Sequence, residues 1–312
     1  VTPAMAVGCP VVLKPAPQAP LSAFALAKML EEIGWPKGAI HVMLSGIPVA
    51  EKLVTDERIA MLSFTGSDKV GWHLKAICGK KKVALELGGN ASVIIDDDTD
   101  LAAAAKSVAM GANLYAGQTC ISTQRIYVVE NVHEKFKELL VKEYGNLKAG
   151  DPGDKSISVG PIIDKGHFER ISTWVDEAVK AGANILAGGK AVDADRNIYA
   201  ATLLSNVKHD MKVNCAEVFG PVAVIEPVTS FSKAIANVND SVYGLQVGVY
   251  TNSIAHMKQA HEELEVGGII MNNIPGFRID NMPYGGVKDS GLGREGLKYA
   301  MEEMTEMRLL VY

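Results

Sequence analysis

Residues 59–87 read IAMLSFTGSDKVGWHLKAICGKKKVALEL, and this stretch decides the fold. It begins with an apolar, strand-like run that ends at the turn Thr65-Gly66-Ser67. A helix is predicted from about 67 to 78, and a second strand over 82–87. A strand, a helix and another strand in this order indicate parallel strands joined by a helical crossover. The stretch therefore predicts an α/β fold.

The same alternation continues on both sides of this stretch. Before it, strands are predicted at 11–13 and 40–44, and helices at 20–33 and 47–54. After it, a second α/β unit is predicted with strands at 91–95, 124–129, 183–187, 199–203, 222–228, 246–250 and 266–271, and helices at 99–115, 132–144, 165–181, 231–238 and 253–264. We therefore expect parallel sheets covered by helices, with ligands beyond the carboxyl ends of the strands. Lys14, Gly66 and Glu86 fall at such ends.

Composition narrows the class of protein. A chain of 312 residues favours two domains, and 48% hydrophobic with 21% charged residues is ordinary for a globular protein. The net charge of −5 argues against a nucleic-acid surface, and no apolar run is long enough to span a membrane. We expect neither nucleic acid nor membrane as a partner. The four cysteines form no C-x-x-C pair and have no His at metal-ligand spacing, which favours a reducing, cytoplasmic location and no metal site.

Two glycine-marked turns carry the candidate chemistry. Residues 85–90 read LELGGN and contain Glu86, while residues 117–122 read GQTCIS and contain Cys120. A thiol supplies a nucleophile, a carboxylate supplies a base, and neighbouring glycines let the backbone approach a ligand closely. From the residues alone, Cys120 could instead be a small buried hydrophobe and Glu86 a solvated strand-end carboxylate.

These two turns resemble the active-site motifs of the aldehyde dehydrogenase superfamily. The resemblance continues through FTGS at 64–67, EVFGP at 217–221 and GVKDSG at 286–291, in family order along nearly the whole chain. It implies two doubly wound α/β domains plus a C-terminal oligomerisation strand. In this sequence the expected parts are 1–88 with 290–304 as the remainder of a cofactor-binding domain, 89–289 as the catalytic domain, and 305–312 as the strand.

The resemblance implies NAD(P)-dependent oxidation of a small polar or anionic aldehyde to the carboxylic acid. Cys120 would attack the aldehyde to give a thiohemiacetal, and loss of hydride would leave a thioester. Glu86 would activate the water that hydrolyses this thioester. Its presence disfavours the alternative of a coenzyme-A-acylating semialdehyde dehydrogenase. Cys9, Cys78 and Cys215 have no matching motif and are expected to be structural.

Cofactor binding is assigned by the same resemblance. The turn at Gly66 and Ser67 would hold the pyrophosphate at a helix N-terminus, where unpaired N–H groups attract phosphate. Lys14 would reach the adenosine ribose or a 2′-phosphate; Pro17 stands where NAD-preferring members often have Glu, so NAD and NADP both stay open. Glu217 would hold the nicotinamide ribose, with Phe219 packed beside it. The remaining residues assigned to the cofactor are Gly71, Leu87 and Gly88.

The segment 276–286 resembles family members that oxidise lactaldehyde or glyceraldehyde 3-phosphate. Arg278 could clamp a phosphate or carboxylate bidentately, or form a loop salt bridge with Asp280. Glu295 resembles a second family carboxylate near the proton path, and an ion pair with Arg294 explains it equally well.

The two ends of the sequence lead to further expectations. The chain begins at Val1 rather than Met, and residues 1–10 read as the second half of a helix and its exit turn. By resemblance the chain is expected to lack an N-terminal part that carries the oxyanion-hole asparagine, and to be impaired when taken alone. The apolar tail at 308–312 predicts an edge strand and a homodimer or homotetramer. The remaining alternatives are a catalytically inactive structural fragment of the same fold and, less favoured, a cysteine hydrolase.

Overall fold

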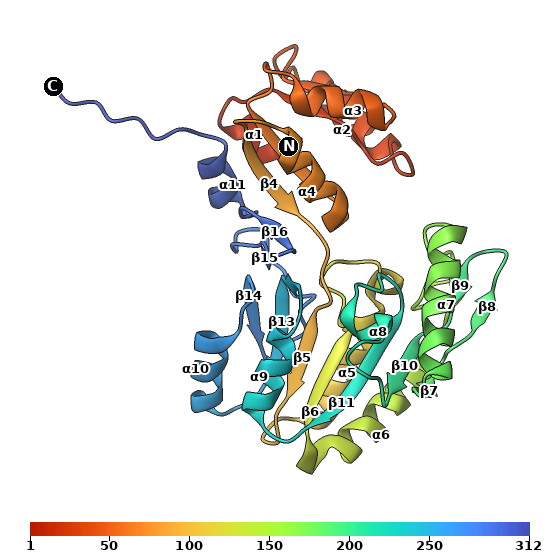
Figure 1. Ribbon diagram of the computed structural model, residues 1–312. Coiled ribbons are helices and arrows are strands. Elements are labelled where there is room, and N and C mark those ends of the chain that lie inside the picture. Colours follow the sequence, from red (N-terminus) through yellow and green to blue (C-terminus); the bar gives the residue numbers. More distant parts are fainter. The chain divides into compact units, whose positions relative to one another are not determined.

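The computed structural model describes residues 1–312, which form two compact units (Figure 1). The first unit comprises Val1–Glu86, Ile279–Gly285 and Gly291–Tyr312, and the second comprises Leu87–Arg278 and Gly286–Ser290. The chain thus leaves the first unit directly after Glu86. Assigning cofactor binding to one unit and catalysis to the other stays a prediction.

The first unit contains short strands and helices in alternation. Its helices are α1 (Thr2–Ala6), α2 (Leu21–Glu32), α3 (Ile47–Thr55), α4 (Asp68–Ile77) and α11 (Leu297–Glu303). Its strands are β1 (Val11–Leu13), β2 (Ile40–Val42), β3 (Met61–Thr65), β4 (Lys82–Glu86) and β16 (Gly291–Leu292). The predicted order of elements is correct as far as β4, and the two-residue strand β16 and helix α11 were not predicted.

The strands of this unit form two sheets, not the single parallel sheet that the alternation predicts. β1 and β2 pair in parallel with each other, while the other sheet has the order β16-β4-β3. β3 and β4 are parallel, with Thr65 opposite Glu86, and β16 pairs antiparallel with β4. The alternation of strands and helices along the chain predicts parallel pairs of strands joined by helices. It does not determine which of these pairs join into one sheet.

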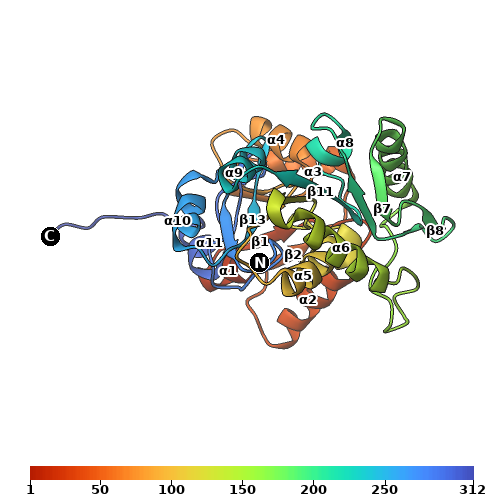
Figure 2. The ribbon, with the colours of Figure 1, turned by 90° about the horizontal axis from the view of Figure 1, so that it is seen from below.

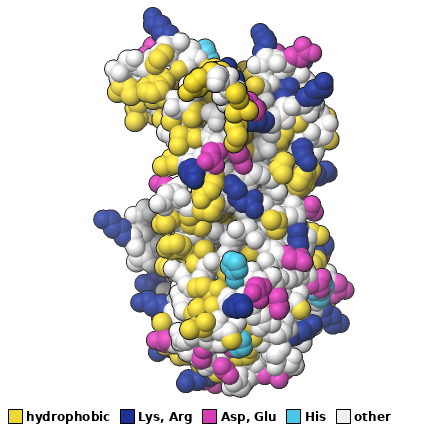
Figure 3. All heavy atoms as spheres, turned by 90° about the vertical axis from the view of Figure 1, so that its left-hand side faces the viewer, with side chains coloured by type: hydrophobic (Ala, Val, Ile, Leu, Met, Phe, Trp, Pro, Cys, Tyr) yellow, Lys and Arg dark blue, Asp and Glu magenta, His cyan; other side chains and the backbone are white.

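The core of the first unit is small. Val54, Leu74 and Cys78 are buried together, with Phe64 and Val83 among the partly buried residues packed against them. Hydrophobic side chains, drawn in yellow in Figure 3, also lie on the surface of the protein. The exposed ones of this unit include Leu21, Met29, Ile33, Ile47, Leu309 and Leu310.

The C-terminal segment forms no strand. Residues 306–312 follow α11 without secondary structure, so the strand expected at 305–312 is not formed within one chain. Lys82 holds the start of this segment, because its ammonium donates to the carbonyl of Thr305 at 2.7 Å. The oligomerisation role of the tail stays a prediction.

The second unit is larger. Its helices are α5 (Leu101–Asn113), the 3-10 turn η1 (Leu114–Gly117), α6 (Glu130–Asn146), α7 (Lys165–Lys180), α8 (Lys212–Cys215), α9 (Phe231–Asn239) and α10 (Ile254–Glu263). Its strands are β5 (Ser92–Ile95), β6 (Arg125–Val129), β7 (Asn184–Ala187), β8 (Ala191–Asp193), β9 (Ile198–Tyr199), β10 (Thr202–Ser205), β11 (Val222–Val228), β12 (Tyr243–Gly244), β13 (Gln246–Tyr250), β14 (Gly268–Met271) and β15 (Val287–Lys288).

Seven of these strands form one sheet in the order β14-β13-β5-β6-β11-β10-β7, which Figure 1 shows from one edge to the other. All neighbours are parallel except β7, which runs antiparallel to β10. The strand predicted at 199–203 is wrong as a single element. The chain leaves β9, which pairs with β8 outside the large sheet, before it enters β10.

Helices cover both faces of this sheet, as the predicted doubly wound architecture requires. Alternate residues of β5 point to opposite faces: Val93 and Ile95 pack in a cluster with α5 and α6, and Ile94 packs in another with α9 and α10. In Figure 2, α5 and α6 lie on one side of the strands and α9 on the other. None of the helices is both long enough and apolar enough to cross a membrane.

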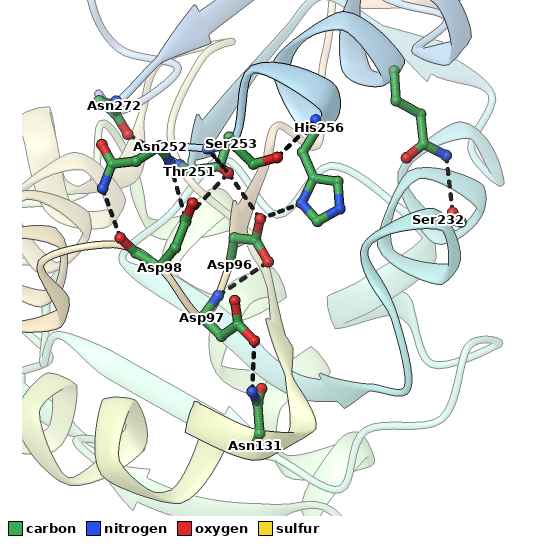
Figure 4. A network of polar contacts seen from close by, with 11 residues as sticks. Asp96, Asp97, Asp98, Asn131, Ser232, Thr251, Asn252, Ser253, His256 and Asn272 are labelled. Carbon is green, nitrogen blue, oxygen red and sulfur yellow. Dashed lines mark hydrogen bonds and ion pairs between the residues drawn. The ribbon is translucent and has the colours of Figure 1, made fainter.

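A polar network fastens the carboxyl end of β5 to that of β13 (Figure 4). The buried carboxylate of Asp96 contacts Nδ1 of His256 at 2.5 Å and accepts a hydrogen bond from the hydroxyl of Thr251 at 2.8 Å. The imidazole of His256 stacks on Phe231, with ring centroids 4.3 Å apart. Buried carboxylates are tolerated where such partners compensate their desolvation. The network therefore joins two strands to α9 and α10 at this end of the sheet.

Candidate active site

The turn before Cys120 has a strained backbone. α5 ends at Asn113, and Tyr115, Ala116 and Gly117 then adopt φ angles of 52°, 57° and 70°. The left-handed region is unfavourable for residues with a Cβ, so two of these three positions store strain that the surroundings must support. Gln118 provides support, because its Nε2 donates to the carbonyl of Pro161 at 3.2 Å and its Oε1 accepts from the amide of Ile163 at 2.8 Å. Cys120 itself is half-buried.

Close glycine contacts bring three distant motifs of the second unit together. A Cβ on Gly89 would lie 2.5 Å from the carbonyl oxygen of Cys120. A Cβ on Gly117 would lie 1.9 Å from the carbonyl oxygen of Gly220. Because neither position has room for a side chain, the loops carrying the Gly-Gly, Cys and Glu-Val-Phe-Gly-Pro motifs pack backbone to backbone.

These three loops immediately precede three adjacent strands. The Gly-Gly turn leads into β5, the Cys120 loop into β6, and the 217–221 loop into β11, and β5, β6 and β11 are neighbours in the sheet. The strands are parallel, so their amino ends share one edge. The expectation that ligands lie beyond the carboxyl ends of strands therefore does not hold for Cys120, the candidate nucleophile, which lies at the amino ends.

Glu217 lies against the Gly-Gly turn. The amide of Gly89 donates to Oε1 of Glu217 at 2.8 Å, and a Cβ on Gly88 would lie 2.7 Å from its Oε2. Nearby, burial lowers the pKa of the Arg170 guanidinium, and the charge of Glu217 partly offsets this. Phe219 is half-buried and has a φ of 47°, which makes it a third strained residue in the candidate site.

Glu86 ends β4 in the first unit, where it is only 8% exposed. Its carbonyl accepts from the amide of Gly66 at 3.1 Å, so the two predicted motif turns adjoin at the carboxyl ends of β3 and β4. A Cβ on Gly285 would lie 3.2 Å from Oε1 of Glu86, which places the carboxylate close to the backbone of that glycine. A carboxylate with little access to water is suited to act as a base.

The start of α4 has features suited to a phosphate. Ser67 is the N-cap, its side chain makes no capping hydrogen bond, and Asp68 is the first helical residue. The amides of the first turn of a helix have no partner within it and point toward an anion placed there. Gly71 is buried within α4, where its amide donates to the carbonyl of Ser67 at 2.9 Å. It supports this turn from inside the helix.

The other predicted residues lie as follows. Lys14 is exposed after β1, with its ammonium 3.0 Å from the carbonyl of Pro15. Leu87 is buried, and its amide donates to the carbonyl of Ser290 at 2.9 Å. Arg278 is exposed at the end of a loop that Gln246 anchors by donating to the carbonyls of Pro275 at 2.5 Å and Phe277 at 3.3 Å.

The remaining cysteines show no comparable setting. Cys78 belongs to the core of the first unit, the thiol of Cys9 lies 3.6 Å from the carbonyl of Met304, and Cys215 is exposed at the end of α8. No group of three or more His, Cys, Asp or Glu side chains is arranged to hold a metal ion.

Two residues that the sequence did not single out contact the 217–221 loop. The side chain of Gln124 bonds to three of the backbone groups around it, and Nη2 of Arg170 donates to the carbonyl of Val218 at 2.7 Å. Gln124 precedes an apolar strand and Arg170 lies within an amphipathic helix, so neither position carries a pattern that would have indicated this contact.

A half-buried cysteine on a strained turn packs against a Gly-Gly turn beside a doubly wound sheet, and this arrangement is suited to a thiol nucleophile. The chain matches the model of the aldehyde dehydrogenase family over residues 1–310. It belongs to the aldehyde dehydrogenase family.

The relatives are enzymes and solved structures of that family. The chain is 45% identical over 310 residues to a 3-sulfolactaldehyde dehydrogenase from Priestia aryabhattai, covering 99% of this chain and 64% of the relative. Aldehyde dehydrogenase 21 from Physcomitrella patens, solved with its reaction product succinate, has a TM-score of 0.94 at 41% identity over 97% of this chain and 63% of that one. A glyceraldehyde-3-phosphate dehydrogenase from Methanocaldococcus jannaschii, solved with NADP, has a TM-score of 0.92 and is 39% identical. The match covers 97% of this chain and 67% of that one. The chain thus spans about two thirds of their length.

Proposed function

We propose that this protein oxidises a small anionic aldehyde to the carboxylic acid with NAD or NADP. The observation that carries the proposal is the contact of Cys120 with Gly89, on a loop that also packs against residues 217–221. It joins the candidate nucleophile to two motifs that the family uses for the cofactor and the base. A structural protein would have no need of a strained turn at its cysteine.

In the proposed mechanism, the thiolate of Cys120 attacks the aldehyde carbon and forms a thiohemiacetal. A bound nicotinamide would supply the hydride acceptor, and Cys120 would then hold the acyl group as a thioester. Glu86 removes a proton from the water that attacks this thioester, which releases the acid and restores the thiol. The helix start at Ser67 would hold the pyrophosphate, and Glu217 the nicotinamide ribose.

The anionic substrate class is supported by what the relatives act on by name. Sulfolactaldehyde carries a sulfonate, succinate is a dicarboxylate, and glyceraldehyde 3-phosphate carries a phosphate. Arg278 is the residue we propose for the anionic end, because a guanidinium on an exposed loop can form two parallel hydrogen bonds with such a group. Pro17 stands where a carboxylate would disfavour the 2′-phosphate of NADP, and Lys14 could bind that phosphate, so NADP remains a candidate cofactor beside NAD.

Two further proposals concern the protein as a whole. The exposed apolar tail at 307–312 would pair with a partner subunit in a homodimer or homotetramer. The location would be cytoplasmic, in keeping with thiols that must stay reduced.

The test is a screen of small anionic aldehydes against NAD and NADP, with acid formation and cofactor reduction followed together. Cys120→Ser should abolish turnover, while Cys215→Ser, the control, should retain it. Glu86→Gln should give a burst of about one reduced cofactor per site followed by slow hydrolysis. The proposal is refuted by full activity in Cys120→Ser. Formation of acyl-coenzyme A in place of free acid would select the acylating alternative.

A further inference from the structure

The loop that carries Glu217 and Phe219 has little structure of its own. It joins the four-residue helix α8 to β11, and Phe219 occupies the left-handed region with a φ of 47°. A residue other than glycine holds such a conformation only where contacts on both sides enforce it. The position of both proposed cofactor residues therefore depends on groups outside the loop.

Gln124 supplies such groups, because its side chain bonds to three backbone groups in α8 and in this loop. Its Nε2 donates to the carbonyls of Val213 at 3.0 Å and Ala216 at 2.7 Å. Its Oε1 accepts from the amide of Val218 at 3.0 Å. Gln124 is 5% exposed, so water does not compete effectively for these groups.

The backbone of Gln124 is fixed independently. Its amide donates to Ala91 at 2.9 Å and its carbonyl accepts from Val224 at 2.8 Å, so it lies within the sheet between β5 and β11. It also lies four positions after Cys120 in the chain. The side chain of Gln124 thus extends from a fixed backbone to the peptide group between Glu217 and Val218. The orientation of this peptide group sets the direction in which the Glu217 side chain leaves the backbone.

We propose that Gln124 is a positioning residue for cofactor binding, which holds Glu217 toward the Gly-Gly turn through the amide of Val218. The inference rests on the proposed role of Glu217 in holding the nicotinamide ribose. Gln124 touches neither substrate nor cofactor in this proposal. Its loss would let residues 216–219 rotate and would weaken the cofactor's contact with Glu217, while the nucleophile turn at 115–118 keeps its own support from Gln118.

The test compares Gln124→Met with Gln246→Met in the whole protein. Both replace a buried glutamine on the same sheet that holds a loop by its amide, and both conserve volume, so both lose stability. Only Gln124→Met should weaken binding of NAD(P), by about tenfold in Kd measured by calorimetry without aldehyde. Alkylation of Cys120 by iodoacetamide without cofactor should stay within about twofold.

A double-mutant cycle separates positioning from general loosening. If Gln124 acts through Glu217, then introducing Gln124→Met into the Glu217→Gln variant should raise the Kd of that variant by at most about twofold. Independent effects would multiply, and that result would overturn the inference, as would an unchanged Kd in Gln124→Met. Should Gln124→Met not fold, Gln124→Glu keeps an oxygen for the amide of Val218 but turns its other oxygen toward the carbonyls of Val213 and Ala216, so it should also raise the Kd, and an unchanged Kd would overturn the inference. Wild-type protein that binds neither NAD nor NADP would refute the proposed function itself.

Discussion

Replacement of Gly89 by alanine is the sharpest probe of the candidate site. The added Cβ would lie 2.5 Å from the carbonyl oxygen of Cys120, whereas ordinary contact begins at 3.4 Å, so the two backbones must separate by about 0.9 Å. The opposing atom belongs to the backbone and cannot rotate away. The φ of Gly89 is not in the left-handed region, so the effect comes from overlap and not from torsional strain.

Two consequences follow from that displacement. Overpacking in a tightly packed region costs about 1–3 kcal/mol of stability. A nucleophile moved by nearly 1 Å from its working position loses on the order of a hundredfold in rate. We therefore expect kcat/KM for aldehyde oxidation to fall about 30–100-fold in Gly89→Ala, with a lower melting temperature.

The control is Gly145→Ala in α6, where a Cβ would meet no heavy atom within 4 Å. Alanine in a helix is favoured over glycine by about 0.5–1 kcal/mol, so this variant should be as stable as the wild type or more so and fully active. The assay is steady-state oxidation of the best aldehyde, with the iodoacetamide rate at Cys120 as a readout that needs no cofactor. Wild-type kcat/KM and an unshifted melting temperature in Gly89→Ala would refute the packing described for the three loops.

Three other predictions concern the second unit. Burial raises the pKa of the Glu226 carboxyl above its ordinary value of 4.5, and the charges of Arg125 and His209 partly offset this rise. The folded state therefore favours the protonated carboxyl, and the protein loses stability as the pH rises above 4.5. Glu226→Gln should therefore raise the melting temperature more at about pH 8 than at about pH 4, and an equal shift at both would contradict this. Asp96→Asn, which removes a buried acceptor from His256 and Thr251, should cost about 3 kcal/mol in urea unfolding, whereas the exposed Asp97→Asn should cost less than about 1 kcal/mol. Phe136→Ala, at a fully buried position of α6, should cost about 3–5 kcal/mol; a loss below about 1 kcal/mol would show that the cluster around α5 and α6 is loosely packed.

Much of the fold could be predicted because the central strands of the large sheet, such as β5, β6 and β13, are buried along their whole length. β11 and β13 were predicted with the bounds that the structure has, since both are rich in apolar, β-branched residues. Helix ends were also marked by polar caps, for example at Asp164 before α7 and Ser230 before α9.

Several of the strands that were missed exist only because they pair with a distant segment. β12, β15 and β16 have two residues each, too few for any periodic pattern, and form because segments far apart in sequence meet. The division of β1–β4 into two sheets is likewise a matter of pairing, which alternation along the chain does not encode.

The resemblance to the aldehyde dehydrogenase family identified the candidate site residues, but not the residues and backbone conformations that hold them in place. Cys120 and Glu217 were singled out by motif, whereas the left-handed Tyr115 and Ala116 could not be anticipated, because nothing in their identity favours a positive φ. Gln124 was missed for a related reason: its significance lies in three backbone groups more than eighty positions away.

The two units use opposite ends of their strands for the predicted chemistry. In the first unit Glu86 ends β4, while Gly66 and Ser67 follow the carboxyl end of β3 and lead into α4, whose N-terminus favours an anion. In the second unit the Gly-Gly, Cys120 and Glu217 loops precede the amino ends of three adjacent strands, while the Asp96–His256 network occupies the carboxyl end (Figure 4). Three loops that enter one sheet side by side hold the backbone of Cys120 by close packing. The sheet can therefore position Cys120 at one end and be stabilised at the other, so a substitution at Asp96 should lower stability alone, whereas one at Gly89 should lower both stability and the rate of aldehyde oxidation.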